Sequence, residues 1–193
     1  MTWTAYDVAT LAVTALTPIT VVGLGVFVAR AGQRLERVQW ANQTVITRRL
    51  DIFGEVAPKL NRLLCFATFV GGWKEITPLA AIELKREADE IMYASRVLFS
   101  NELFEAYREF MAAMFEMYAI TGADALLRAP IDSKWGDRRK LHRWSPSTES
   151  LFSTAKPGSM DDIQAAYERL GERFRADLYV THDRALLPAS NVA

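Results

Sequence analysis

The pattern of apolar and polar residues divides the chain into one long uncharged run near its start and a series of amphipathic segments. Residues Val8 to Ala29 carry no charge, and Arg30 follows at once. As a helix that rises about 1.5 Å per residue, this run would be about 33 Å long, close to the roughly 30 Å hydrocarbon core of a bilayer. The pattern therefore predicts a short outside segment and one transmembrane helix within residues 1–30.

A cleaved signal peptide is the main alternative for this run, and a buried core helix is a second one. Ala29-Arg30-Ala31 imitates a signal-peptide cleavage site, but the start MTWTAYD holds no Lys or Arg. The apolar stretch is also longer than the 7–15 residues usual in signal peptides. A spanning anchor therefore fits the pattern better than either alternative.

The charges that flank the run predict its orientation. Arg30, Arg34 and Arg37 follow it closely, and no basic side chain precedes it. Because positive residues stay on the cytoplasmic side, the N-terminus is expected outside and the C-terminus in the cytoplasm. The predicted location is the inner membrane of a bacterial cell, as a single-pass protein in contact with membrane lipid.

Residues 31–193 are expected to form one cytoplasmic helical domain, because apolar residues recur in steps of three and four along four segments. Thr77-Pro78, Ser100 and Ser159 resemble helix N-caps, Gly71-Gly72 resembles a stop, and Pro58 is expected to kink or restart the first helix. The predicted inward positions are Ile46, Leu50, Phe53, Ala57, Leu60 and Leu64; Leu84, Ala88, Ile91, Ser95 and Leu98; Leu103, Tyr107, Phe110, Met114 and Tyr118; and Ile163, Tyr167, Leu170, Phe174 and Leu178. The fold class is therefore all-α, an antiparallel helical bundle behind an N-terminal transmembrane helix.

Composition adds few constraints on function. Lys plus Arg equals Asp plus Glu, at 23 each among 193 residues, so net charge indicates no nucleic-acid partner. The single cysteine, Cys65, excludes an intrachain disulfide framework and suits a reducing compartment. It lies between Leu64 and Phe66, which favours a small core residue over a nucleophile.

Enzyme chemistry has little support in the sequence. The chain has two histidines and no zinc-binding spacing, phosphate-binding glycine loop or catalytic-triad order, so neither a metal nor a cofactor is expected. The exception is Arg175 and His182, with six residues between them. This spacing resembles the Arg-x(4–6)-His signature of HEPN ribonucleases, which implies a membrane-tethered ribonuclease as an alternative function.

A basic and aromatic stretch lies within the polar segment of about residues 123–158. The sequence from Arg128 to Trp144 reads RAPIDSKWGDRRKLHRW. Basic residues interleaved with aromatic ones can bind a nucleotide, single-stranded nucleic acid or lipid headgroups. The predicted binding residues are Lys134, Trp135, Arg138, Arg139, Lys140, Arg143 and Trp144. The competing interpretation is a solvated loop whose tryptophans pack back on the bundle.

Small and hydroxyl side chains line one face of the predicted transmembrane helix. Thr10, Thr14 and Thr17 are spaced by four and three, and Gly25 falls beside this stripe. Such residues favour close helix–helix contact and interhelical hydrogen bonds, so a homo-oligomer is expected, with these four residues at its interface. A threonine-lined pore and hydroxyls that bond their own backbone carbonyls are the alternatives.

The region from about residue 48 to 118 resembles a family of small bacterial membrane proteins with one N-terminal span and a helical cytoplasmic domain. The resemblance is carried by RRLDIFGEVAPKLNRLLCFATFVGGWKEITP and ELKREADEIMYASRVLFSNELFEAYREF, with LNRLLCFATFVGGWKE as its most distinctive piece. It implies no catalytic residues. The layout, though not the motifs, is also similar to the membrane accessory protein of type VI-B CRISPR systems.

These observations predict a non-enzymatic, oligomeric membrane protein with an interaction or effector role, of which membrane-perturbing antiviral defence is the sharpest form. A scaffold that recruits a cytoplasmic protein partner through the aromatic helix around Phe110 is a further alternative. Whether a nucleic acid or nucleotide binds is left open by the sequence.

Overall fold

The computed structural model describes residues 30, 42–117, 125–141, 144–154 and 158–179. The predicted transmembrane run and its threonine stripe lie outside these residues. Within the described ranges, no helix combines the length and the apolar character that crossing a membrane requires. The chain divides into two compact units, Met1–Thr47 and Arg48–Ala193, and the site described below belongs to the second unit.

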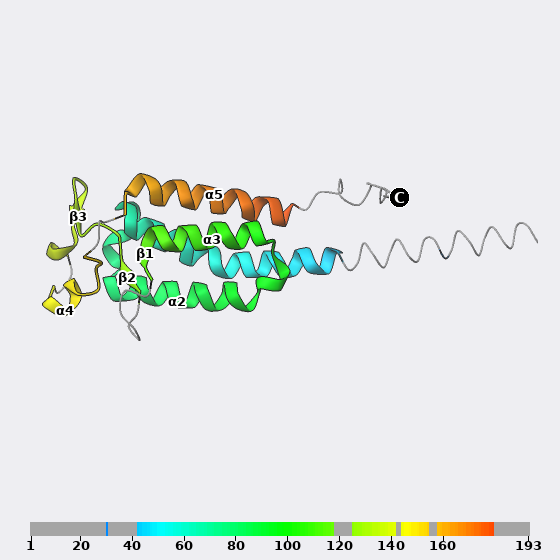
Figure 1. Ribbon diagram of the computed structural model, residues 1–193, viewed down its shortest axis with the longest axis horizontal. Coiled ribbons are helices and arrows are strands. Elements are labelled where there is room, and N and C mark those ends of the chain that lie inside the picture. Colours follow the sequence, from blue (N-terminus) through cyan, green and yellow to red (C-terminus); the bar gives the residue numbers. More distant parts are fainter. Residues whose placement is uncertain (1–29, 31–41, 118–124, 142–143, 155–157, 180–193) are drawn as a thin grey trace, which may run out of the picture. The chain divides into compact units, whose positions relative to one another are not determined.

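The second unit is mostly helical, which confirms the helical part of the predicted fold class. Residues 42–68 are helical, and this helix is followed by α2 (Pro78–Ala94), α3 (Asn101–Met114) and α5 (Met160–Leu178). Figure 1 shows α2, α3 and α5 lying side by side with the helix that ends at residue 68. The short helices are η1 (Trp73–Glu75), η2 (Arg96–Leu98), η3 (Arg138–Lys140) and α4 (Pro146–Glu149).

Two short antiparallel strand pairs add to the helices, and the sequence pattern did not predict them. Strand β1 (Phe115–Glu116) pairs with β2 (Leu126–Leu127), and β3 (Asp132–Ser133) pairs with β4 (Gly136–Asp137). Each strand is two residues long, which is too short for an alternating apolar pattern to become visible.

The predicted helix signals at Thr77 and Ser100 are confirmed. The Thr77 hydroxyl accepts a hydrogen bond from the Ala80 N–H at 3.1 Å, and the Ser100 hydroxyl accepts one from the Leu103 N–H at 3.1 Å. These bonds satisfy N–H groups that lack a partner in the first helical turn. Gly71 adopts a positive φ of 58° just after the helix that ends at residue 68. The predicted restart at Pro58 is wrong, because residues 42–68 are helical without a break.

The buried face of the first helix agrees only in part with the predicted one. Leu60 is buried and Phe53 and Leu64 are half-buried against the core, as predicted, but Leu50 is 51% exposed. The almost completely buried residues also include Ile52, Val56 and Leu63, which were not predicted. The predicted face therefore overlaps the real one and is rotated from it. Both stripes have helical spacing, and only the position of the neighbouring helices decides between them. In α3 and α5 the predicted inward residues are largely confirmed, with Leu103, Tyr107, Phe110, Met114, Ile163, Leu170 and Phe174 buried.

The burial of Phe110 has a functional consequence. Its side chain has no exposed surface and belongs to the core of the second unit. It also packs edge-on against Tyr167 of α5, with ring centroids 5.5 Å apart. The Phe110 ring is therefore covered by the chain itself, and recruitment of a partner by the helix around it stays a prediction.

Hydrogen bonds of Arg49 and Asp177 connect the C-terminal ends of η2 and α5 with the N-terminal end of α3. The Arg49 guanidinium donates from Nε to the Leu98 carbonyl at 2.5 Å and from Nη1 to the Asp177 carbonyl at 2.7 Å. The Asp177 carboxylate accepts a hydrogen bond from the Ser100 N–H at 2.7 Å. A cation at a helix C-terminus and a carboxylate at an N-terminus both oppose the helix dipole favourably.

Candidate interaction site

The basic and aromatic stretch folds into a short hairpin that presents a tryptophan to solvent. In the pairing of β3 with β4, Ser133 lies opposite Gly136, and Lys134 and Trp135 form the turn. The Trp135 N–H donates to the Ser133 hydroxyl at 3.1 Å, which holds the turn in place. Trp135 is 61% exposed, and the Lys134 ammonium lies 4.8 Å from the centroid of its ring.

Arg138 anchors this hairpin to the bundle. Its side chain has no exposed surface. Its guanidinium donates from Nε to the Pro130 carbonyl at 3.0 Å and from Nη2 to the Phe66 carbonyl. The guanidinium carbon also lies 3.9 Å from the Phe66 ring centroid and 4.1 Å from that of Phe69. The hairpin is thus attached to the end of the helix that stops at residue 68.

The charge of Arg138 is stabilised without a carboxylate. Among the residues that the structure describes, no carboxylate forms an ion pair with it, and its Nη1 is buried without a hydrogen-bond partner. Burial lowers the pKa of Arg138 to about 9, so the group still carries its proton at neutral pH. Carbonyl oxygens in the last turn of a helix and the faces of aromatic rings both attract a cation.

The position of Arg138 corrects one part of the sequence prediction. The prediction grouped it with polyanion-binding residues, but a guanidinium enclosed by the chain's own rings and carbonyls does not face a partner. Its role is to hold the hairpin, and the exposed cations are its neighbours. Charge alone did not reveal this, because Arg138 and Arg139 are adjacent and identical in type.

Gly136 and Trp73 form the other part of the anchor, which the sequence did not reveal. A Cβ atom added at Gly136 would lie 2.5 Å from the Trp73 side chain, so only glycine permits this close approach. Trp73 is 4% exposed and packs edge-on against Phe69, at 4.8 Å between ring centroids. No short-range pattern links residues 73 and 136, which are far apart along the chain.

The remaining predicted binding residues are divided between the surface and the bundle. Arg139 and Lys140 are exposed in η3, although the Arg139 guanidinium lies 3.9 Å from a Glu149 carboxylate oxygen. Trp144 is half-buried against Phe152, at 5.7 Å between ring centroids, so this tryptophan does pack back on the chain. Arg143 lies outside the described residues.

A second arginine of the same segment also contacts the end of a helix. The Arg128 guanidinium donates from Nη1 to the carbonyl of Ala112, in the last turn of α3, at 3.3 Å. Part of the basic character of residues 128–144 therefore serves to cap helices. Among the described residues of this segment, the exposed cations that a partner could meet are Lys134, Arg139 and Lys140.

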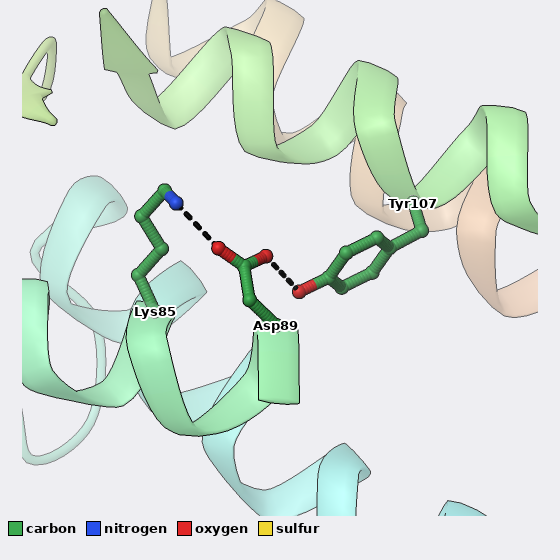
Figure 2. A network of polar contacts seen from close by, with 3 residues as sticks. All are labelled: Lys85, Asp89 and Tyr107. Carbon is green, nitrogen blue, oxygen red and sulfur yellow. Dashed lines mark hydrogen bonds and ion pairs between the residues drawn. The ribbon is translucent and has the colours of Figure 1, made fainter. Parts of the chain in front are cut away.

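A separate polar network lies between α2 and α3, as Figure 2 shows. The Lys85 ammonium lies 2.5 Å from one oxygen of Asp89, and the Tyr107 hydroxyl donates to the other oxygen at 2.6 Å. Burial and the hydrogen bond to the carboxylate raise the pKa of Tyr107. The Lys85 side chain is 7% exposed, and its ammonium lies 5.7 Å from the Phe115 ring centroid. Because every member of the network has a partner inside the bundle, its role is to fix α2 against α3.

The other predicted site residues can be placed only in part. Arg175 is exposed on α5, while His182 lies outside the described residues, so the ribonuclease pair stays a prediction. The interface residues Thr10, Thr14, Thr17 and Gly25 also lie outside them. Within the part of the chain that the structure describes, no group of three or more His, Cys, Asp or Glu residues could hold a metal ion.

Comparisons with known proteins give no relative: no protein-family profile, no curated protein and no solved structure matches this chain. The fold and the site define a helical-bundle protein with an anchored, solvent-exposed hairpin.

Proposed function

We propose that this chain is a membrane-anchored, self-associating interaction protein of the bacterial inner membrane, and that its anchored hairpin binds single-stranded nucleic acid in the cytoplasm. The observation that carries the proposal is Trp135, which is 61% exposed at the tip of a hairpin held by Arg138. The exposed ring offers a flat apolar face, and covering this face with a ring of a partner removes apolar surface from water. The hydrogen bonds of Arg138 keep the Trp135 ring in one place, which lowers the entropy that the protein loses on binding.

The hairpin lies at the end of the second unit that is opposite to Arg48, where this unit begins. Arg138 contacts Phe66, whereas the unit begins at Arg48, at the other end of the same helix. Eighteen residues at about 1.5 Å each separate the two ends by about 27 Å. In Figure 1, β3 and α4 accordingly lie at the opposite end of the bundle from the C-terminal end of α5.

The exposed side chains suit a ligand with flat rings and phosphates. An exposed aromatic ring stacks on an unpaired base, which contributes about 1–3 kcal/mol per base in known complexes. Lys134 lies in the turn, and Arg139 and Lys140 are exposed in η3, directly after β4, so these cations can contact phosphates. Asp132 in β3 and Glu149, which pairs with Arg139, limit the net charge, so stacking is expected to contribute more than charge.

The direct test uses the full-length chain in mild detergent and a fluorescent single-stranded oligonucleotide. Trp135→Ala should weaken binding about 5- to 150-fold, which corresponds to the loss of one stacked base. Tyr179→Ala is the matched control. Tyr179 is 72% exposed just after the C-terminal end of α5, away from the hairpin (Figure 1), so its replacement should not affect binding. Equal affinities of the wild type and Trp135→Ala, or no binding at low salt, would refute the role of the hairpin.

Charge can be tested separately from stacking. Lys134→Gln combined with Lys140→Gln should lower the affinity at low salt and reduce the slope of log affinity against log salt by about 1.4, since each phosphate contact contributes about 0.7 for single strands. Both side chains are exposed, so the melting temperature should stay unchanged. An unchanged slope would show that the lysines make no phosphate contact.

The membrane part of the proposal is supported by the uncharged run from Val8 to Ala29 and the arginines after it. A C-terminal reporter that works only in the cytoplasm should be active. Release by alkaline carbonate, or a mature chain that begins near Gly32, would contradict a spanning anchor. If the effector role is antiviral and membrane-perturbing, overexpression should lower the membrane potential, and an unchanged potential would argue against it.

A further inference from the structure

The helical residues just before the second unit carry an exposed apolar side chain. Val45 is 40% exposed, and Asn42 is also exposed on the same helical stretch. A helical valine with this exposure is unremarkable alone, but Val45 belongs to a regular repeat in the sequence. The repeat indicates what covers it.

The repeat is a heptad pattern with alternating steps of four and three. Leu35, Val38, Asn42 and Val45 occupy successive a and d positions. The same spacing continues toward the N-terminus through Ala31, Val28, Leu24, Val21, Thr17, Thr14 and Thr10. The part of this spacing that lies within the uncharged run from Val8 to Ala29 is not distinctive, because almost every position there is uncharged. The informative part is Ala31, Leu35, Val38, Asn42 and Val45, where charged and polar residues separate the repeat positions.

Toward the C-terminus, the next positions of the repeat are used inside the second unit. Arg49 donates to the Leu98 carbonyl at 2.5 Å, and Ile52 and Val56 are 3% and 0% exposed. From Arg49 onward, the repeat packs against the unit's own helices. At Asn42 and Val45, the described residues place no comparable cover over the repeat, since both side chains are exposed.

We propose that a second copy of this chain packs against residues 42–48 in a parallel coiled coil, with Asn42 facing Asn42 and Val45 facing Val45. This inference deepens the self-association in the proposed function and rests on it, because copies anchored in one membrane with one orientation must run parallel. An asparagine at an a position pairs with its own copy and fixes register and subunit number at some cost in stability. The same heptad face is used by both copies, so a two-fold dimer buries the face on each copy and leaves none free for further copies.

Cysteine crosslinking of the full-length chain in native membranes tests this contact. In a Cys65→Ser background, Asn42→Cys and Val45→Cys should give disulfide-linked dimers under mild oxidation. Gln43→Cys and Thr47→Cys are matched controls. The Thr47 hydroxyl donates to the Gln43 carbonyl at 2.9 Å, and both residues lie on a helix face outside the repeat. Their crosslinking should be at least about tenfold weaker, because a disulfide requires Cα atoms within about 7 Å.

The mass of the native protein in mild detergent separates this inference from the proposed function. An oligomer that crosslinks at 42 and 45 but not at 43 and 47 supports the coiled coil. An oligomer with equal crosslinking at all four positions refutes the coiled coil and leaves self-association intact. A monomeric native protein refutes both. Asn42→Val should keep the assembly and raise its melting temperature, and dissociation of this variant would also overturn the proposed packing.

Discussion

Arg138 and Arg139 are adjacent and chemically identical, yet the structure predicts very different results when each is replaced by alanine. Arg138 is completely buried and donates to two carbonyls, those of Pro130 and Phe66. The Arg139 side chain is 44% exposed, and its ion pair with Glu149 is long at 3.9 Å. The comparison isolates burial, because residue type and position along the chain are matched.

The magnitude for Arg138→Ala follows from the groups that it leaves behind. The buried Phe66 carbonyl loses a donor at a cost of about 1–3 kcal/mol, and the part-buried Pro130 carbonyl adds a smaller cost. The vacated space between Phe66, Phe69 and Trp73 adds a cavity cost, whereas removal of a desolvated charge offsets part of the loss. We therefore expect a net destabilisation of about 3 kcal/mol, a large part of the 5–15 kcal/mol typical of a domain. Arg139→Ala should change stability by less than about 0.5 kcal/mol.

The assay is denaturant unfolding of the full-length chain in mild detergent, followed by helical circular dichroism and tryptophan fluorescence. The two signals should separate in Arg138→Ala, because release of the hairpin changes the surroundings of Trp73. If Arg138→Ala is as stable as Arg139→Ala, then the guanidinium does not anchor the hairpin, and the argument that Trp135 is held in place fails.

Three further predictions concern the polar network and the membrane interface. The pKa of Tyr107 is raised in the folded state. Its contribution to the free energy of unfolding is therefore fully present below the unfolded-state pKa of about 10 and is lost as the pH rises above that value. Tyr107→Phe should therefore remove part of the stability loss above pH 10, and identical alkaline profiles of wild type and variant would contradict the shift. Lys85→Met should cost about 2 kcal/mol, less than for a fully buried pair, because the Asp89 side chain is 26% exposed. Lys59→Met, which breaks an exposed pair, is its control in thermal unfolding, and equal melting temperatures would refute the difference. In the proposed oligomer, Gly25→Leu should loosen the assembly by holding the expected transmembrane helices apart, and an unchanged mass in detergent would exclude that interface.

Sequence pattern alone predicted the helical character of the described part of the second unit and much of its local structure. The three- and four-residue spacing identified α3 and α5 with their buried faces, because amphipathic helices repeat their apolar residues at the helical period. The N-caps at Thr77 and Ser100 could also be predicted, because a cap depends only on residues within one helical turn of each other. The uncharged run from Val8 to Ala29 carries the membrane prediction in the same local way.

Tertiary structure alone decided which residues of the hairpin can meet a partner. Arg138 and Arg139 look the same in the sequence, and only the arrival of Phe66, Phe69 and Trp73 from distant positions buries one of them. The same holds for the first helix, where Leu50 is exposed although its spacing matches an apolar face. Local spacing predicts that a helix has an apolar face. Whether a residue of that face is buried depends on the elements that pack against it, and these elements come from distant parts of the chain.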